Sequence, residues 1–369
     1  MDKKKSFLKN PTVQTILASL LCIVLGLLIG YIALLIINPA GATSAILAVI
    51  ENFWTYSKAT AQLKNFGNTL AKTAPLLMCS LSVLFAYKVG LFNIGAAGQY
   101  VIGAGASLYL ALACGMPWWV CVLAAIAAGA IVGGLSGFLK AWFNVNEVIS
   151  CIMLNWISLY GVNILLTTVK EQASPYTVSI KSVNTSALLP TLGLDELFGS
   201  KYVTIAIPLA VIIAVAVWFL LTKTRLGYEL RATGLNKNAA KYCGMREKFN
   251  IVLTMAIAGG LASLGAALFF LSGFEQWSVT QSSVPGMGFN GIAAAFLGGL
   301  HPIGAIFSSY FIQHITSGGA YVDKTMYASQ ISDFISSVII YLCGFVLFFK
   351  QAMNRRIARR EELKGGEVK

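Results

Sequence analysis

Long apolar runs recur along the whole chain, and shorter polar stretches separate them. Each run has about the 20 residues that an α-helix needs to cross the hydrocarbon core of a bilayer. The pattern predicts about ten spanning helices, at 13–37, 68–87, 96–114, 117–139, 148–168, 202–222, 251–271, 286–300, 302–318 and 331–349. We therefore expect an all-α polytopic membrane protein.

Composition agrees with this pattern. Hydrophobic residues make up 57% of the chain, charged residues make up only 11%, and the mean hydropathy is +0.74. This is too little charge to solvate the surface of a globular protein of this size. We expect a basic N-terminal segment at 1–12, a transmembrane domain at 13–350 and a basic tail at 351–369. The first apolar run is longer than the usual core of a signal peptide, so an uncleaved anchor is expected.

Lysine and arginine gather in three places: before the first run, in the loop 223–250 and after the last run. Cytosolic segments of membrane proteins carry an excess of these residues. Six runs separate the first two clusters and four separate the last two, and both numbers are even, so all three clusters can lie on one side. We predict a multi-pass protein of the cell (plasma or inner) membrane with cytosolic N- and C-termini. This orientation explains the net charge of +13 without a nucleic-acid partner.

Motifs of catalytic chemistry are missing from the sequence. There are two histidines and no H-E-x-x-H, G-x-S-x-G, C-x-x-C or P-loop pattern. We predict no enzyme activity, no metal site and no cofactor bound by this chain. Lys72, Glu147 and Asp333 fall toward the ends of apolar runs, where snorkelling to the interface is expected, whereas a proton-driven transporter would need ionisable groups near the bilayer centre.

Glycines predict close helix packing at two places. Gly129, Gly133 and Gly137 recur at four-residue spacing and leave one helix face without side chains, so that another backbone can approach. A second face of this kind is formed by Gly259, Gly260 and Gly265. Such faces predict a tightly packed bundle and indicate no function by themselves.

The loop 223–250 is long and mostly polar, and it reads KTRLGYELRATGLNKNAAKYCGMREKFN. Asn236 can cap a short helix over 237–243, because its side-chain oxygen can accept a free backbone N–H. Gly244 can adopt the left-handed conformation that ends the helix. A two-turn helix in such a loop needs a surface to dock against. The alternative is a basic loop that only fixes orientation.

Two segments share the dipeptide F-N followed by glycine and small residues. The first F-N segment (92–99, FNIGAAGQ) opens the third run, and the second (289–294, FNGIAA) lies in the eighth, five runs later. Five is odd, so the two run in opposite directions and predict an inverted five-plus-five organisation. Glycine-interrupted polar segments at corresponding positions indicate a transport pathway, with coincidence in a glycine-rich chain as the alternative. Asn155 and Trp156 add an amide and an aromatic ring in the fifth run.

Four motifs together resemble one known family. They are GLFNIGAAGQ (90–99), NEVISCIMLNWI (146–157), GYELRATGLNKNAAKYCG (227–244) and GFNGIAAAFLGGLHPIG (288–304). With them the chain resembles the membrane-spanning permease subunits of ABC importers for simple sugars, nucleosides and branched-chain amino acids, most of all the nucleoside and simple-sugar branch. The chain departs from the family pattern at Ala97, where glutamate is common, and at His301, where asparagine is common.

The resemblance implies a ten-helix permease half similar to the vitamin B12 importer. It also implies four partners: a second and, in the nucleoside branch, different permease, a cytosolic ABC ATPase that holds ATP and Mg²⁺, an extracellular substrate-binding protein, and membrane lipid. Part of the loop 223–250, residues 227–244, would be the coupling helix that contacts the ATPase. The residues expected in coupling are Glu229, Arg231, Gly234, Asn236, Ala239, Ala240 and Gly244.

The residues expected in the translocation pathway are Phe92, Asn93, Gln99, Asn155, Trp156, Phe289 and Asn290. They offer flat aromatic faces beside amide groups and no fixed charge, which suits a neutral, ring-containing solute. We therefore expect a nucleoside, with a simple sugar and then a branched-chain amino acid as alternatives. A self-sufficient secondary transporter or channel is the alternative of another class.

Overall fold

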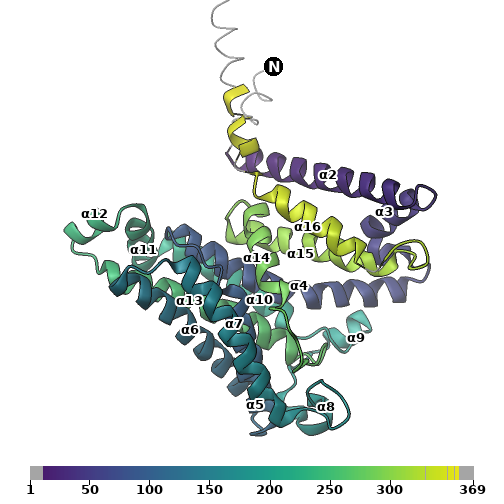
Figure 1. The fold of residues 1–369 in the computed structure, drawn as a ribbon, viewed down its shortest axis with the longest axis horizontal. Helices are drawn as coiled ribbons and strands as arrows, with labels where there is room; N and C mark the ends of the chain where they lie inside the picture. The colour runs from purple at the N-terminus through teal and green to yellow at the C-terminus, as the bar shows by residue number, and fades with distance from the viewer. Residues whose placement is uncertain (1–10, 329, 347, 353, 357–369) are drawn as a thin grey trace, which may run out of the picture. The chain divides into compact units, whose positions relative to one another are not determined.

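The computed structural model of the protein describes residues 11–328, 330–346, 348–352 and 354–356 (Figure 1). These residues are helical or irregular, with no β-strand and only two isolated bridges, between Lys170 and Thr177 and between Tyr176 and Ser278. The predicted all-α fold is confirmed. The predicted basic ends lie mainly outside the described residues, at 1–10 and 357–369.

A helix lies in each of the ten predicted apolar runs. They are α2 (Pro11–Ile37), α4 (Ala59–Lys88), α5 (Ala96–Leu112), α6 (Trp118–Phe143), α7 (Glu147–Leu166), α10 (Ala206–Lys223), α13 (Glu247–Phe270), α14 (Gly286–Leu297), α15 (Pro302–Gly318) and α16 (Ile331–Cys343). Within the described residues, six of them are long and apolar enough to span a membrane, namely α2, α4, α6, α7, α10 and α13. The other four have 17 residues or fewer. Ten spans therefore stay a prediction.

Short helices occupy the connections. They are α3 (Ala42–Glu51), η1 (Asn52–Thr55), η2 (Thr167–Val169), α8 (Ile180–Val183), η3 (Thr185–Ala187), α9 (Leu194–Phe198), α11 (Arg225–Leu235), α12 (Lys237–Tyr242) and η4 (Gly319–Tyr321). Two of these, α11 and α12, lie in the loop 223–250, where the sequence predicted only the second.

The sequence predicted that Lys72 lies toward the end of a helix, and the structure places it elsewhere. Helix α4 begins at Ala59, well before the predicted start at 68, so Lys72 lies near its middle. The residues before 68 mix polar with apolar side chains and form no long apolar run, so the sequence did not indicate that they belong to the helix. Asn65 Nδ2 there donates to Ala61 O, one turn earlier, at 2.9 Å. The Lys72 ammonium lies over the ring of Phe274, 5.1 Å from its centroid, so the charge has an aromatic partner near the middle of the helix.

The chain divides into two compact units, which we describe separately. Unit 1 comprises residues 1–55, 296–299 and 314–369, and unit 2 comprises 56–295 and 300–313. In unit 1, α2 packs along α16, and Gly26 and Gly30 make room for Ile339 and Ile335. Unit 2 holds both F-N segments and the loop 223–250.

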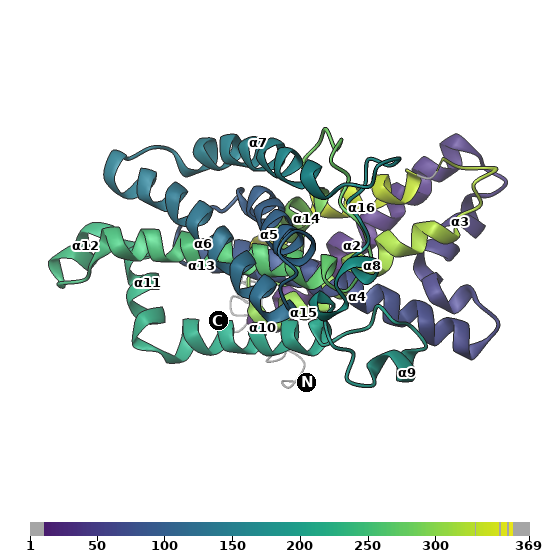
Figure 2. The ribbon, with the colours of Figure 1, turned by 90° about the horizontal axis from the view of Figure 1, so that it is seen from below.

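The core of unit 2 is built around α13, which packs against α6, α4 and α5 (Figure 2). The glycine face predicted on α6 is confirmed and packs on α13 at Gly259. Gly265, predicted in the same face as Gly259, packs instead on Pro75 and Met78 of α4. A Cβ added at Gly133 would overlap Met255 O, and one added at Gly259 would overlap Gly129 O. The backbones of α6 and α13 therefore touch, which only residues without a side chain allow. Helices α11 and α12 lie at the opposite end of unit 2 from α8 (Figures 1 and 2).

Candidate functional site

Helices α11 and α12 are each fixed at their start by a side-chain cap. Thr224 Oγ1 accepts the N–H of Gly227 at 3.0 Å and begins α11. Asn236 has extended backbone between the two helices, and its Oδ1 accepts the N–H groups of Asn238 and Ala239, each at 3.0 Å. The predicted capping by Asn236 is confirmed.

Gly244 ends α12 as the sequence predicted. Its φ is +79°, in the left-handed region, and no atom lies within 4 Å of the position a Cβ would take. The N–H of Met245 reaches Ala240 O at 3.0 Å, and the N–H of Gly244 reaches Lys241 O at 3.0 Å. These two bonds form a Schellman motif. The helix itself ends at Tyr242, one residue earlier than predicted.

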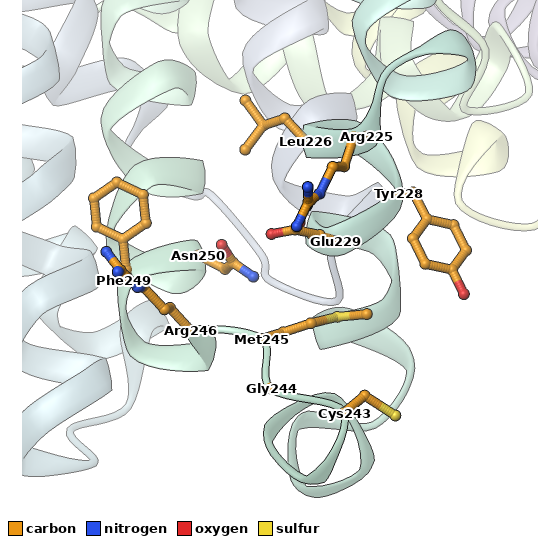
Figure 3. Close-up of a pocket in the computed structure, with 10 residues that line it drawn as sticks. All are labelled: Arg225, Leu226, Tyr228, Glu229, Cys243, Gly244, Met245, Arg246, Phe249 and Asn250. Carbon is orange, nitrogen blue, oxygen red and sulfur yellow. The ribbon is translucent and has the colours of Figure 1, made fainter.

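A cavity of about 520 Å³ lies between α11 and the start of α13 (Figure 3). It is lined by Arg225, Leu226, Tyr228, Glu229, Cys243, Gly244, Met245, Arg246, Phe249 and Asn250. The sequence predicted Glu229 and Arg231 as coupling residues, and both bond within α11. Glu229 Oε1 pairs with Arg225 Nε at 2.9 Å, and Arg231 Nε donates to Gly227 O at 3.3 Å.

Buried contacts attach both short helices to α13. Asn250 Nδ2 donates to Thr233 Oγ1 at 2.8 Å, and both side chains are buried. Ala240 is also buried, at 4% exposure, whereas Ala239 faces outward. The two adjacent alanines therefore have different surroundings: Ala240 faces the protein, and Ala239 is free to meet another surface.

Two large apolar side chains of this loop were not singled out by the sequence analysis. Leu235 is 89% exposed and Tyr242 is 93% exposed, and each ends one of the short helices. Exposed apolar side chains held on rigid helix ends are typical anchors of protein–protein contacts. The sequence does not distinguish them, because the same loop also contains Leu226, Tyr228, Leu230, Met245 and Phe249.

The first F-N segment forms a buried amide network. Asn93 Nδ2 donates to Gln99 Oε1 at 2.8 Å and to Ser82 Oγ at 2.9 Å, and Gln99 Nε2 donates back to Asn93 Oδ1 at 3.2 Å. All three side chains are at most 1% exposed. Since each amide satisfies the other, the network fixes the non-helical chain between α4 and α5.

Asn155 connects this segment to α7. Its Oδ1 accepts the N–H of Gly98 at 2.8 Å, and its Nδ2 donates to Ile94 O at 3.2 Å. The neighbouring Trp156 is 42% exposed and stacks on Tyr160, with ring centroids 5.9 Å apart. The structure thus brings together the predicted Asn93, Gln99 and Asn155 and leaves the Trp156 ring accessible.

The backbone directly before the second F-N segment touches the first segment. A Cβ added at Gly288, directly before the second segment, would overlap the backbone of Ala97 in the first. Ala97 is fully buried there, so the glutamate that the family often has at this position would not fit in this packing. Phe289 is 39% exposed and Asn290 is half-buried.

The other departure from the family pattern, His301, lies at the start of α15. Its Nδ1 accepts the N–H of Ile303 at 3.2 Å and so caps that helix. Burial lowers the pKa of His301, and the positive charge of Lys88 lowers it further. The imidazole is therefore neutral at pH 7, as the acceptor role of Nδ1 requires. No group of three or more histidine, cysteine or acidic side chains that could hold a metal occurs among the residues described.

Comparison with known proteins gives a consistent set of relatives. The family described as "Branched-chain amino acid transport system / permease component" matches residues 65–344. The guanosine ABC transporter permease protein NupP of Bacillus subtilis is 31% identical over 88% of this chain and 92% of its own length. The nucleoside ABC transporter permease protein NupB of Lactococcus lactis is 31% identical over 90% of this chain and 91% of its own.

A more distant relative is named for a different substrate. The glucose ABC transporter permease protein TsgB13 of Haloferax volcanii is 28% identical over 78% of each chain. No solved structure matches the chain.

Proposed function

Because this chain belongs to the permease-component family of branched-chain amino acid transport systems and is a multi-pass membrane protein, we propose that it forms half of the pathway of an ATP-driven ABC importer for a nucleoside. The observation that supports this most is the 31% identity to two nucleoside or guanosine permeases over about nine-tenths of the chain. On this proposal the chain is a transport subunit and no enzyme.

The exposed surface of α11 and α12 is the proposed contact with a cytosolic ATPase. Leu235, Tyr242 and Ala239 face outward, while Asn236 and Gly244 set the ends of α12. ATP and Mg²⁺ would be held by the partner, since this chain has no P-loop motif. Binding and hydrolysis of ATP there would bias two packings of the helices, one open inward and one open outward.

The other permease of the complex is proposed to be a different chain. Bacillus subtilis and Lactococcus lactis each have two differently named permeases that are similar to this one. An extracellular binding protein would deliver substrate to the loops at 38–67, 170–201 and 272–285, and both termini would be cytosolic.

A nucleoside fits the proposed pathway because its base can stack and its ribose can hydrogen-bond. Trp156 and Phe289 offer exposed aromatic faces, and Phe92 is half-buried. The buried amides of Asn93, Gln99 and Asn155 hold these segments in place. Asn290 is half-buried and adds a polar group. A simple sugar is the second candidate, supported by the glucose permease among the relatives.

The test is uptake by the assembled transporter in proteoliposomes, after co-purification in mild detergent and identification of the partners by mass spectrometry. Labelled guanosine should enter only with ATP and the ATPase subunit present. Unlabelled nucleosides should block entry, and ribose or galactose at the same concentration should not. The opposite pattern of competition would reject the nucleoside assignment, and uptake without any ATPase subunit would favour a secondary transporter.

A further inference from the structure

Helix α4 ends in a glycine turn that leads directly into the first F-N segment. The N–H of Leu91 reaches Ala86 O and the N–H of Gly90 reaches Tyr87 O, each at 3.0 Å, and the φ of Gly90 is +75°. This is the Schellman arrangement, in which a left-handed residue reverses the chain. Asn93 and its amide network follow three residues after Gly90.

Gly234, near the end of α11, lies against this turn. A Cβ added at Gly234 would overlap the carbonyl group of Val89, and one added at Gly90 would come within 2.7 Å of Gly234 O. Each glycine also has an exposed side. The loop 223–250 and the turn that precedes the first F-N segment therefore meet backbone to backbone, with no side chain between them that could absorb a displacement.

Both sides of this contact are firmly held. On the loop side, the residue before Gly234 is the buried Thr233, which Asn250 bonds to α13 at 2.8 Å. On the other side, Leu91 is buried in a cluster with Cys151 and Met255. From there the Asn93 network leads along the first F-N segment to Ala97, whose backbone lies against Gly288, directly before the second F-N segment. The contacts form one connected series within unit 2.

We infer that the contact between Gly234 and the Val89–Gly90 turn passes movement of α11 to the two F-N segments, and that Gly90 and Gly234 are positioning residues of the transport cycle. This inference rests on the proposed function, since it needs an ATPase that displaces α11. A movement of α11 along the turn would pull on Leu91 and Asn93 and so change how the first F-N segment sits against α7 and the second segment. Neither glycine needs to touch substrate.

Two matched pairs of variants test this. Gly234→Ala and Gly161→Ala both place alanine in a helix, where it is favoured over glycine. Only the first meets a neighbour, because nothing lies within 4 Å of a Cβ at Gly161. Gly90→Ala and Gly115→Ala both place alanine at positive φ, +75° and +63°, and only Gly90 has an atom within 4 Å. Gly161→Ala therefore has the same change in helix propensity as Gly234→Ala, and Gly115→Ala has a similar backbone strain to Gly90→Ala. Neither control adds a contact with a neighbouring residue.

The readout is alkylation of the buried Cys151, measured by peptide mass spectrometry with and without ATP in the assembled transporter. Cys151 Sγ lies 4.0 Å from Asn93 Oδ1 and is fully buried, so its rate of alkylation reports on the first F-N segment. In the wild type and in both controls, ATP should change this rate by about tenfold, within the usual range of coupling between sites. Gly234→Ala and Gly90→Ala should lose the change and most of the uptake while binding the ATPase in normal amounts.

Either of two results would overturn the inference. One is an unchanged ATP response at Cys151 in Gly234→Ala or Gly90→Ala. The other is a wild-type transporter that takes up nucleoside with ATP and shows no response at Cys151. If one of the two variants is lost from the membrane, the other decides. A wild type without ATP-dependent uptake would instead contradict the proposed function, so the two failures are distinguishable.

Discussion

The side chain of Asn236 holds the start of α12, and its replacement by alanine gives a direct test of the loop geometry. Asn236→Ala would leave the N–H groups of Asn238 and Ala239 without their acceptor. Loss of such a cap costs about 1 kcal/mol, with a range of about 0.5–2. A helix of six residues cannot persist alone in water. Without the Asn236 cap, α12 would be held only by the buried Ala240 and by the Gly244 turn.

The expected effect is an increase of about fivefold in the unfolded population of α12, since 1 kcal/mol corresponds to roughly that factor. Lys237 and Lys241 lie in this helix, and trypsin cuts a chain only where it has opened locally. When reclosing is fast, the rate of cleavage follows the open population. Cleavage after Lys241 in the purified protein, followed by mass spectrometry, should therefore become about fivefold faster in Asn236→Ala.

Two further variants make the comparison specific. Asn236→Asp keeps an acceptor oxygen and should be cut at the wild-type rate. Asn238→Ala removes an exposed amide that makes no side-chain hydrogen bond within the described residues, so it should also leave the rate unchanged. Equal cleavage of Asn236→Ala and wild type would refute the view that the cap holds α12, and faster cleavage of Asn238→Ala would show that any change in this loop opens it.

Three other predictions concern packing, topology and pH. Gly133→Ala should destabilise the protein by about 1–3 kcal/mol, because the added Cβ overlaps α13. Gly134→Ala is the control, since a Cβ there would lie 3.6 Å from its nearest neighbour, and it should leave the melting temperature in detergent unchanged. Equal melting temperatures of the two variants would contradict the packing of α6 on α13. An engineered cysteine at Ser186 should react with an impermeant label from outside the cell, and one at Lys237 only after the membrane is opened. One predicted span, 202–222, separates the two positions, so labelling of both from one side would refute the predicted topology. The pKa of His301 is lowered in the folded protein, so the unfolded chain takes up the proton first as the pH falls. The contribution of the neutral His301 cap to stability is therefore fully present above pH 6.5, the ordinary pKa of histidine, and is lost as the pH falls below it. The melting temperature should therefore fall more between pH 8 and pH 5 in the wild type than in His301→Ala. An equal fall in both proteins would show that His301 does not cause the pH dependence.

Features set by local rules were predictable from the sequence. The positions of the ten apolar helices, the cap at Asn236 and the terminator at Gly244 depend on residues within a few positions of one another. The glycine face of α6 was predictable as well, since it needs only helical spacing. Its partner was not, because Met255 and Gly259 lie more than a hundred residues away and no local pattern links them.

Other features were missed or misplaced. Helix α4 begins earlier than predicted, because its first residues mix polar with apolar side chains and form no long apolar run, so Lys72 lies near the middle of the helix and not toward its end. Helix α11 was not predicted, because polar and charged residues interrupt the apolar spacing that would indicate a helix. The meeting of Gly90 and Gly234 brings two predicted motifs together, and only the folded chain shows which glycines face each other. The roles of the pathway and coupling residues stay predictions.

The backbone contact between α6 and α13 also has a consequence for how the protein is made. Helix α6 ends at Phe143, and α13 does not begin until Glu247. At a synthesis rate of about 5–20 residues per second, roughly 5–20 s pass before the partner of the glycine face leaves the ribosome. During that time the glycine face of α6 can contact only lipid or other helices. We expect this interval to be the stage of biogenesis at which the nascent chain depends most on insertion factors.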